Sequence, residues 1–374
     1  MDTLKNKVNL NALTGSKIVS VIGILFIIIS IILICLWLYG VLHKDKKNCS
    51  NMKSIYKDFP KITNIDITNK DKSCHSLRDY YIKTAYNCCS AGNYKNDYVN
   101  VCALKECIRQ GVRCLDFQIF SIDNKPVIAV STQKDFFIKE SWNYISFSQA
   151  MDIVANYAFS GGTCPNPRDP LILHFRIMSN NVNIYDTMST SIKGSFKSQS
   201  LLLDPKFSFE SNGINLGAIP IVNLMGKVII IVDKTNPLFE GTSLDEYVNI
   251  SSNSIFMRSL QYHDVRYTPD MNELINFNKK NMTICLPDLG EYPTNPSAPL
   301  AMNYGCQMVA MCFQNNDSNL SFYNDEFNSN NSAFIVKPMN LRYIPVNAPI
   351  PPPPAENLSY KSRDVSSDFY AFQV

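Results

Sequence analysis

The stretch Asp79–Phe120, DYYIKTAYNCCSAGNYKNDYVNVCALKECIRQGVRCLDFQIF, decides the fold. It contains two short runs rich in apolar residues, Tyr81–Tyr86 and Cys114–Phe120, each of the length of a buried strand. Between them, Asn100–Gln110 has the pattern of a helix. A strand, a helix and a second strand in this order predict two parallel strands joined by a crossover helix.

The same alternation of strand-like and helical segments continues as far as residue 313. A further helical segment, Phe147–Ser160, follows, and six more runs have strand character. These are PVIAVS (126–131), LILHFRI (171–177), KVIIIVD (227–233), SIFMRS (254–259), MTICLP (282–287) and CQMVAMCF (306–313). Eight strands with crossover helices predict an α/β domain that forms a (β/α)8 barrel of the TIM type.

Composition narrows the class of protein. With 374 residues, 45% of them hydrophobic, the chain can bury one large core. The formal charge of +3 and the lack of a stripe of Lys/Arg among aromatic residues exclude nucleic acid as an expected partner. Asn is plentiful while Gly, at 14 residues, is scarce. Such usage is typical of AT-rich genomes, including those of large DNA viruses.

The N-terminal region predicts a membrane anchor. After a polar leader (1–17), residues 18–42, IVSVIGILFIIISIILICLWLYGVL, form an uncharged run that can cross roughly 30 Å of hydrocarbon as a helix. A signal peptide has a shorter apolar region, of about 7–15 residues, and no small-residue cleavage site follows this run. A buried core helix is the other alternative. We therefore expect a single-pass membrane protein, of a virion or a host intracellular membrane, with a polar linker at 43–76.

Lysines flank both ends of this run, so they constrain its orientation only weakly. Three precede it and four follow it, namely Lys5, Lys7 and Lys17, and Lys44, Lys46, Lys47 and Lys53. The excess on the C-terminal side slightly favours a domain that faces the cytosol.

The opening stretch resembles the catalytic barrel of phosphoinositide-specific phospholipase C, which reads D-Y-F-I-x-S-S-H-N-T-Y and then G-C-R-C-x-E-L-D. Later segments match further family motifs: Pro126–Ile128, Pro170–Arg176, Leu224–Ile230, Met282–Pro287, Asn303–Ala310 and Ala333–Pro338. The resemblance implies an X-like half-barrel (77–235), a short connection (236–245) and a Y-like half-barrel (246–343).

The resemblance also implies that the catalytic groups are gone. Family members cleave a phosphodiester with two histidines and a calcium ion. Tyr86 stands at the position of the first histidine and Val130 at that of the second. Loss of a positioned general base typically costs about 10²–10⁴-fold in rate.

The matched calcium positions are altered as well. Asn87 keeps a family ligand, Asp116 replaces a glutamate, Gln118 replaces an aspartate, and Arg176 replaces the last glutamate. Calcium needs several oxygen ligands, usually with more than one carboxylate. We therefore expect no metal or other cofactor, and an ion pair between Asp116 and Arg176 across the barrel mouth.

Four substrate positions are also replaced. Ile231 and Asp233 stand where the family has phosphate-binding lysines, and Ile284 and Leu286 where it has an arginine and a tyrosine. The apolar replacements, with Val130, predict that no polar cavity survives. His174 shares the strand face of Arg176, and a buried, hydrogen-bonded core histidine is its expected role.

The cysteines and the tail leave alternatives open. Cys114 and Cys306 coincide with family cysteines and are expected to be buried apolar residues. The extra Cys88, Cys89, Cys102, Cys107 and Cys164 could form disulfides if the domain faces an oxidising space, and no connectivity follows from sequence. Residues 344–374 are expected to be a flexible tail whose Pro-rich run, IPVNAPIPPPPA, is either a stiff spacer or a docking site for a protein partner.

The sequence therefore favours a membrane-anchored phospholipase C-like pseudoenzyme with a structural or interaction role. The alternative is an active phosphoric diester hydrolase with a rearranged, calcium-independent site. A non-catalytic reader of lipid headgroups is a third hypothesis, which the loss of the phosphate-binding cations disfavours.

Overall fold

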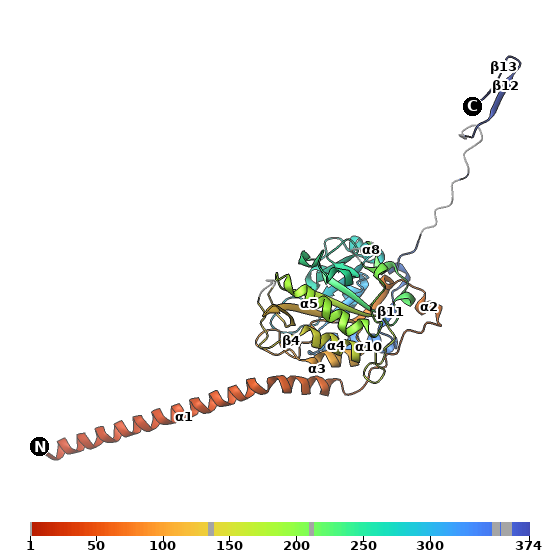
Figure 1. The fold of residues 1–374 in the computed structure, drawn as a ribbon. Coiled ribbons are helices and arrows are strands. Elements are labelled where there is room, and N and C mark those ends of the chain that lie inside the picture. Colours follow the sequence, from red (N-terminus) through yellow and green to blue (C-terminus); the bar gives the residue numbers. More distant parts are fainter. Residues whose placement is uncertain (1, 134–137, 209–212, 346–351, 353–360) are drawn as a thin grey trace. The chain divides into compact units, whose positions relative to one another are not determined.

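The computed structural model describes residues 2–133, 138–208, 213–345, 352 and 361–374, without the side chains of residues 2–18 and 72. The chain divides into two compact units, Met1–Arg342 and Tyr343–Val374, which are described separately. Figure 1 shows the first unit as a barrel with helices around it and the long helix α1 (Asp2–Ile55).

Eight parallel strands form the barrel in the order β7-β6-β5-β2-β1-β10-β9-β8. The end strands β7 and β8 contact each other, so that the barrel is nearly closed. The strands are β1 (Tyr80–Ala85), β2 (Cys114–Ile122), β5 (Leu171–Ile177), β6 (Val228–Asp233), β7 (Ile250–Ser252), β8 (Met257–Gln261), β9 (Met282–Leu286) and β10 (Met308–Met311). The predicted (β/α)8 barrel is confirmed.

One predicted strand has a different role. The run at 126–131 becomes β3 (Lys125–Ile128), which pairs antiparallel with β2 and with β4 (Ile145–Ser146) instead of entering the barrel. The reason is the turn before it: Asp123 and Asn124 have φ of 50° and 57°, the conformation of a tight hairpin turn. The barrel strand that takes its place is β7 (Ile250–Ser252), which the sequence did not predict because Ile-Ser-Ser is not an apolar run.

Helices cover the outside of the barrel. The predicted crossover helices are confirmed as α3 (Val101–Arg109) and α4 (Phe147–Tyr157). Asn100 caps α3 by accepting a hydrogen bond from the backbone N–H of Cys102. The other α-helices among the described residues are α2 (Lys70–Ser73), α5 (Asn183–Ile192), α7 (Tyr262–Arg266), α8 (Met271–Lys280), α9 (Ala298–Asn303) and α10 (Ser318–Ser329), and β11 (Phe334–Val336) pairs antiparallel with β1.

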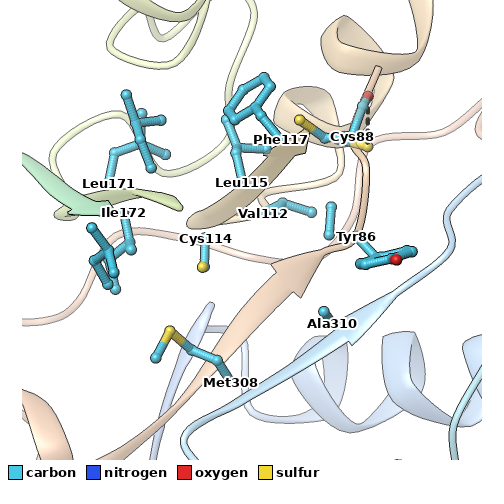
Figure 2. Close-up of a cluster of buried hydrophobic side chains, with 14 of the residues drawn as sticks. Tyr86, Cys88, Val112, Cys114, Leu115, Phe117, Leu171, Ile172, Met308 and Ala310 are labelled. Carbon is cyan, nitrogen blue, oxygen red and sulfur yellow. Dashed lines mark hydrogen bonds between the residues drawn. The ribbon is translucent and has the colours of Figure 1, made fainter. Parts of the chain in front are cut away.

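Alternation along the strands separates two apolar layers. In Figure 2, Leu115 and Phe117 of β2 point to the opposite side of the strand from Cys114. All three are fully buried, because helices cover one face and the barrel interior receives the other. Cys114 and Cys306 are buried free thiols, as expected from sequence.

The segment after the apolar run differs from the predicted linker. Residues 43–55 continue α1, which includes a candidate membrane span, and no residue of its most apolar window is buried. Met52, Tyr56 and Ile62 are buried against the barrel, and Cys49 forms a disulfide with Cys102. Single apolar residues and a cysteine within an otherwise polar segment make these contacts, so a hydropathy pattern does not reveal them.

The second unit contains a hairpin. Strands β12 (Asp364–Ser367) and β13 (Tyr370–Gln373) pair antiparallel. Most of the Pro-rich run, expected to be either a stiff spacer or a docking site, lies outside the described residues.

Candidate functional site

A cavity of about 290 Å³ opens at the carboxyl ends of the barrel strands. Polar side chains that line it include Gln118, Arg176, Asp233, Asn253, Gln261 and Asp264. The expectation that no polar cavity survives is therefore wrong. Of the four apolar replacements, only Leu286 lines this cavity, whereas Val130, Ile231 and Ile284 are buried outside its lining.

The predicted ion pair between Asp116 and Arg176 is present next to this cavity. Arg176 donates two hydrogen bonds to the carboxylate, from Nε to Oδ1 at 2.9 Å and from Nη2 to Oδ2 at 2.6 Å. Asp116 is fully buried and Arg176 is 9% exposed. A two-point bond of this kind holds both planar groups in one orientation.

Each partner stabilises the charged form of the other. Burial alone would raise the pKa of Asp116, but the charge of Arg176 and the hydrogen bonds from His174 and Arg176 hold it below its ordinary value. For Arg176, burial favours the neutral form, and the carboxylate of Asp116 reverses this effect and raises the pKa.

The residues that the resemblance matches to calcium ligands do not fit a calcium ion. The guanidinium of Arg176 uses both oxygens of Asp116 and also donates to Oδ1 of Asn87 at 2.8 Å. Oε1 of Gln118 accepts the backbone N–H of Ser131 at 2.9 Å. The oxygens that could coordinate the ion are thus committed, and a fixed positive charge lies among them. In the described part of the chain, no three His, Cys, Asp or Glu side chains are placed to hold a metal.

The two positions that the resemblance matches to catalytic histidines hold buried residues, Tyr86 and Val130. The ring of Tyr86 lies 4.7 Å from the guanidinium carbon of Arg176, as in a cation–π contact, and packs edge-on against Tyr94. Burial raises the pKa of Tyr86. Val130 is 1% exposed, and its apolar side chain cannot transfer a proton. Neither residue can act as the base that a histidine would supply.

The positions that the resemblance matches to substrate-binding residues lie on β6 and β9. Ile231 and Ile284 are fully buried. Asp233 lines the cavity, and its Oδ1 accepts hydrogen bonds from the backbone of Thr235 and from Asn253. With Asp233 and Asp264 in the lining and Arg176 paired with Asp116, the described lining lacks an unpaired cation for a phosphate.

His174 is the buried, hydrogen-bonded histidine expected from the sequence, and its contacts form a chain of three residues. Its Nδ1 lies 2.8 Å from Oδ1 of Asp116 and its Nε2 lies 3.0 Å from Oγ of Ser252. Because an ionised carboxylate only accepts hydrogen bonds, Nδ1 donates to Asp116. The shared strand parity of His174 and Arg176 indicated this position. Ser252 was missed because β7 was missed.

Comparison with known proteins finds a family match over part of the chain and solved structures with the same fold. Residues 237–340 match the model of the phosphatidylinositol-specific phospholipase C Y domain. The barrel also superposes on two solved structures, PLC21 of L. pealei (TM-score 0.60, 17% identity) and PLC21 of S. officinalis (TM-score 0.59, 18% identity). Each match covers 75% of this chain and 39% of the other. Among curated proteins, none matches this chain.

Proposed function

Because this chain has the barrel fold and, over residues 237–340, the Y domain of the phosphoinositide-specific phospholipases C, we propose that it is a membrane-anchored, catalytically inactive relative of these enzymes. Its role is structural or one of interaction, in a virion or a host intracellular membrane. The setting rests on the Asn-rich, Gly-poor amino-acid composition, which is typical of proteins from AT-rich genomes. The apolar span of α1 attaches it to that membrane.

The observation that carries the proposal is the position of the Arg176 guanidinium. It binds Asp116 and Asn87 where the resemblance implies a calcium ion, and its charge would repel such an ion. The histidine positions hold Tyr86 and Val130, so the usual acid and base are missing too. Binding of a phosphoinositide headgroup is disfavoured for a related reason, since two carboxylates line the cavity.

The test is release of soluble inositol phosphate from phosphoinositide vesicles that contain the full-length chain. The release is measured with calcium and with a chelator. An active enzyme of the family, assayed in parallel, distinguishes a catalytically inactive barrel from a failed assay. We expect no release above the protein-free vesicles in either condition. Release at a rate comparable to that of the active enzyme would overturn the proposal.

The second candidate, a calcium-independent phosphoric diester hydrolase, is favoured by one observation. Asp116, His174 and Ser252 form a hydrogen-bonded chain like that of an activated serine, close to a polar cavity. Against it, Ser252 is fully buried and does not line the cavity. If release does occur and Ser252→Ala abolishes it while the surface variant Ser148→Ala does not, this second function holds.

A further inference from the structure

The helical turns that follow the apolar span contact the barrel along α3, and the two helices run in the same direction. We call Lys44–Tyr56 the docking segment. Along it, Asp45 accepts hydrogen bonds from Asn100, Cys49 is bonded to Cys102, and the backbone oxygen of Tyr56 accepts a hydrogen bond from Arg109. Residue numbers rise together in both partners, so the docking segment runs parallel to α3.

This direction identifies which face of the barrel is nearest to the apolar span. Helix α3 leaves the carboxyl end of β1 and leads to the amino end of β2. Its N-terminus therefore lies at the carboxyl-end face, the face where the cavity opens. The docking segment begins at that face, only two residues after the span ends at Leu42. Tyr56, 12 residues on and about 18 Å along the helix, lies at the opposite end of α3.

The loops at the carboxyl-end face provide a surface suited to a membrane interface. We call loops 86–100, 138–144 and 287–297 the rim. Lys44 bridges to it, bonding Asp97 at 2.8 Å and lying over the ring of Trp142 at 5.4 Å. Trp142, Tyr144 and Tyr292 of the rim are 40%, 48% and 63% exposed. Tryptophan and tyrosine are the residues enriched at membrane–water interfaces.

The disulfide makes this docking covalent. Bonds between cysteines persist on the oxidising side of a membrane and are reduced in the cytosol. A bond between Cys49 and Cys102 thus opposes the weak preference for a cytosolic domain that the lysines indicated. The bond also links the anchor helix α1 to α3, the helix that runs from the carboxyl-end face of the barrel to its amino-end face.

We propose that the docking segment, closed by the Cys49–Cys102 disulfide, holds the barrel on the oxidising side of its membrane with the rim against the lipid headgroups. This inference rests on the membrane anchor in the proposed function. The partner surface is the bilayer that the apolar span of the same chain crosses, because the span ends within one helical turn of the rim.

The orientation is tested by quenching with phospholipids that carry bromine on their acyl chains, using the full-length chain in vesicles. Trp37→Phe leaves Trp142 as the sole tryptophan. We expect Trp142 to lose much of its fluorescence in brominated vesicles. The matched control adds Trp142→Phe and Arg168→Trp, which moves the probe to an exposed site just before β5, at the amino-end face. It should lose little. The reverse ranking, or equal quenching, would overturn the orientation.

The disulfide is tested in isolated native membranes by labelling thiols with a maleimide polymer under denaturing conditions, before and after reduction. Reduction should expose two additional thiols, and Cys49→Ser should abolish this difference. Labelling of Cys49 without reduction would overturn the clamp. Treatment of the membranes with alkaline carbonate tests the anchor separately. If α1 does not span the membrane, this treatment should extract the chain.

Discussion

At the scale of single residues, one substitution changes the chemistry of the site most. Arg176 stands where the resemblance implies a ligand carboxylate, and it forms an ion pair with the neighbouring Asp116. The pair is buried, so its contribution must be judged against the cost of removing two charges from water. The pair is therefore better evidence of a site with fixed, neutralised charge than of a large gain in stability.

Removing one partner should be far more costly than removing both. We expect Arg176→Met to lower the free energy of unfolding by about 3–5 kcal/mol, because it leaves the buried carboxylate of Asp116 unpaired. The exposed pair Arg258–Glu273 offers a control, and Arg258→Met should cost less than about 1 kcal/mol. Denaturant unfolding of the detergent-solubilised chain measures both changes. If Asp116→Asn combined with Arg176→Met is no more stable than Arg176→Met alone, the unpaired charge is not the cause.

At the scale of elements, the docking of α1 depends on a close approach to the loop after β1. A Cβ atom added at Gly92 would lie 2.5 Å from Nδ2 of Asn48 and would also meet the carboxylate of Asp97. Those two side chains are hydrogen-bonded to each other, and Asp97 also binds Lys44. Gly92 is thus the position where the loop and α1 leave no room for a side chain.

Gly92→Ala should therefore loosen the docking segment from the barrel. We expect it to lower stability by about 1–3 kcal/mol, as overpacking does, and to slow formation of the Cys49–Cys102 disulfide during oxidative refolding. Gly161→Ala is the control, since nothing lies within 4 Å of a Cβ at that position. An unchanged rate of disulfide formation in Gly92→Ala would show that the loop adapts without disturbing α1.

At the scale of the whole molecule, two buried lysines make stability depend on pH. Lys83 in β1 donates to the backbone oxygen of Gln110, and Lys337 donates to the backbone oxygens of Asn278 and Gly305. Burial lowers the pKa of each lysine to about 7, from an ordinary value of 10.5. Between these values the unfolded chain holds a proton on each lysine that the folded chain has released.

Because the unfolded state binds more protons, stability should rise as the pH increases from about 7 towards 10.5. The slope is at most about 1.4 kcal/mol per pH unit for each lysine, and below this window both states are protonated and the effect is constant. Thermal or denaturant unfolding at pH 7, 8 and 9 measures the rise. Lys83→Met should reduce the slope and the exposed Lys125→Met should not. Equal slopes in the two variants would contradict the assignment to Lys83.

The sequence by itself determined those features of the protein that rest on local patterns. Apolar runs located seven of the eight barrel strands, and helical spacing located α3 and α4. Strands and helices follow from neighbours along one element, and a linear pattern records those neighbours. The resemblance, which matches Asp116 and Arg176 to calcium-ligand positions, indicated their ion pair.

Only the tertiary structure decided the features that join distant segments. β7 is too short and polar to form an apolar run, so Ser252 and its bond to His174 could not be located. The cavity is present because polar side chains from several strands surround it, and three of the four apolar replacements are buried outside its lining. The docking segment contacts the barrel through Lys44, Asn48 and Cys49. The partners of these residues are distant in the sequence, and Cys49 and Cys102, for example, are separated by 53 positions. Contacts at that separation depend on how the chain packs in space, which no local periodicity encodes.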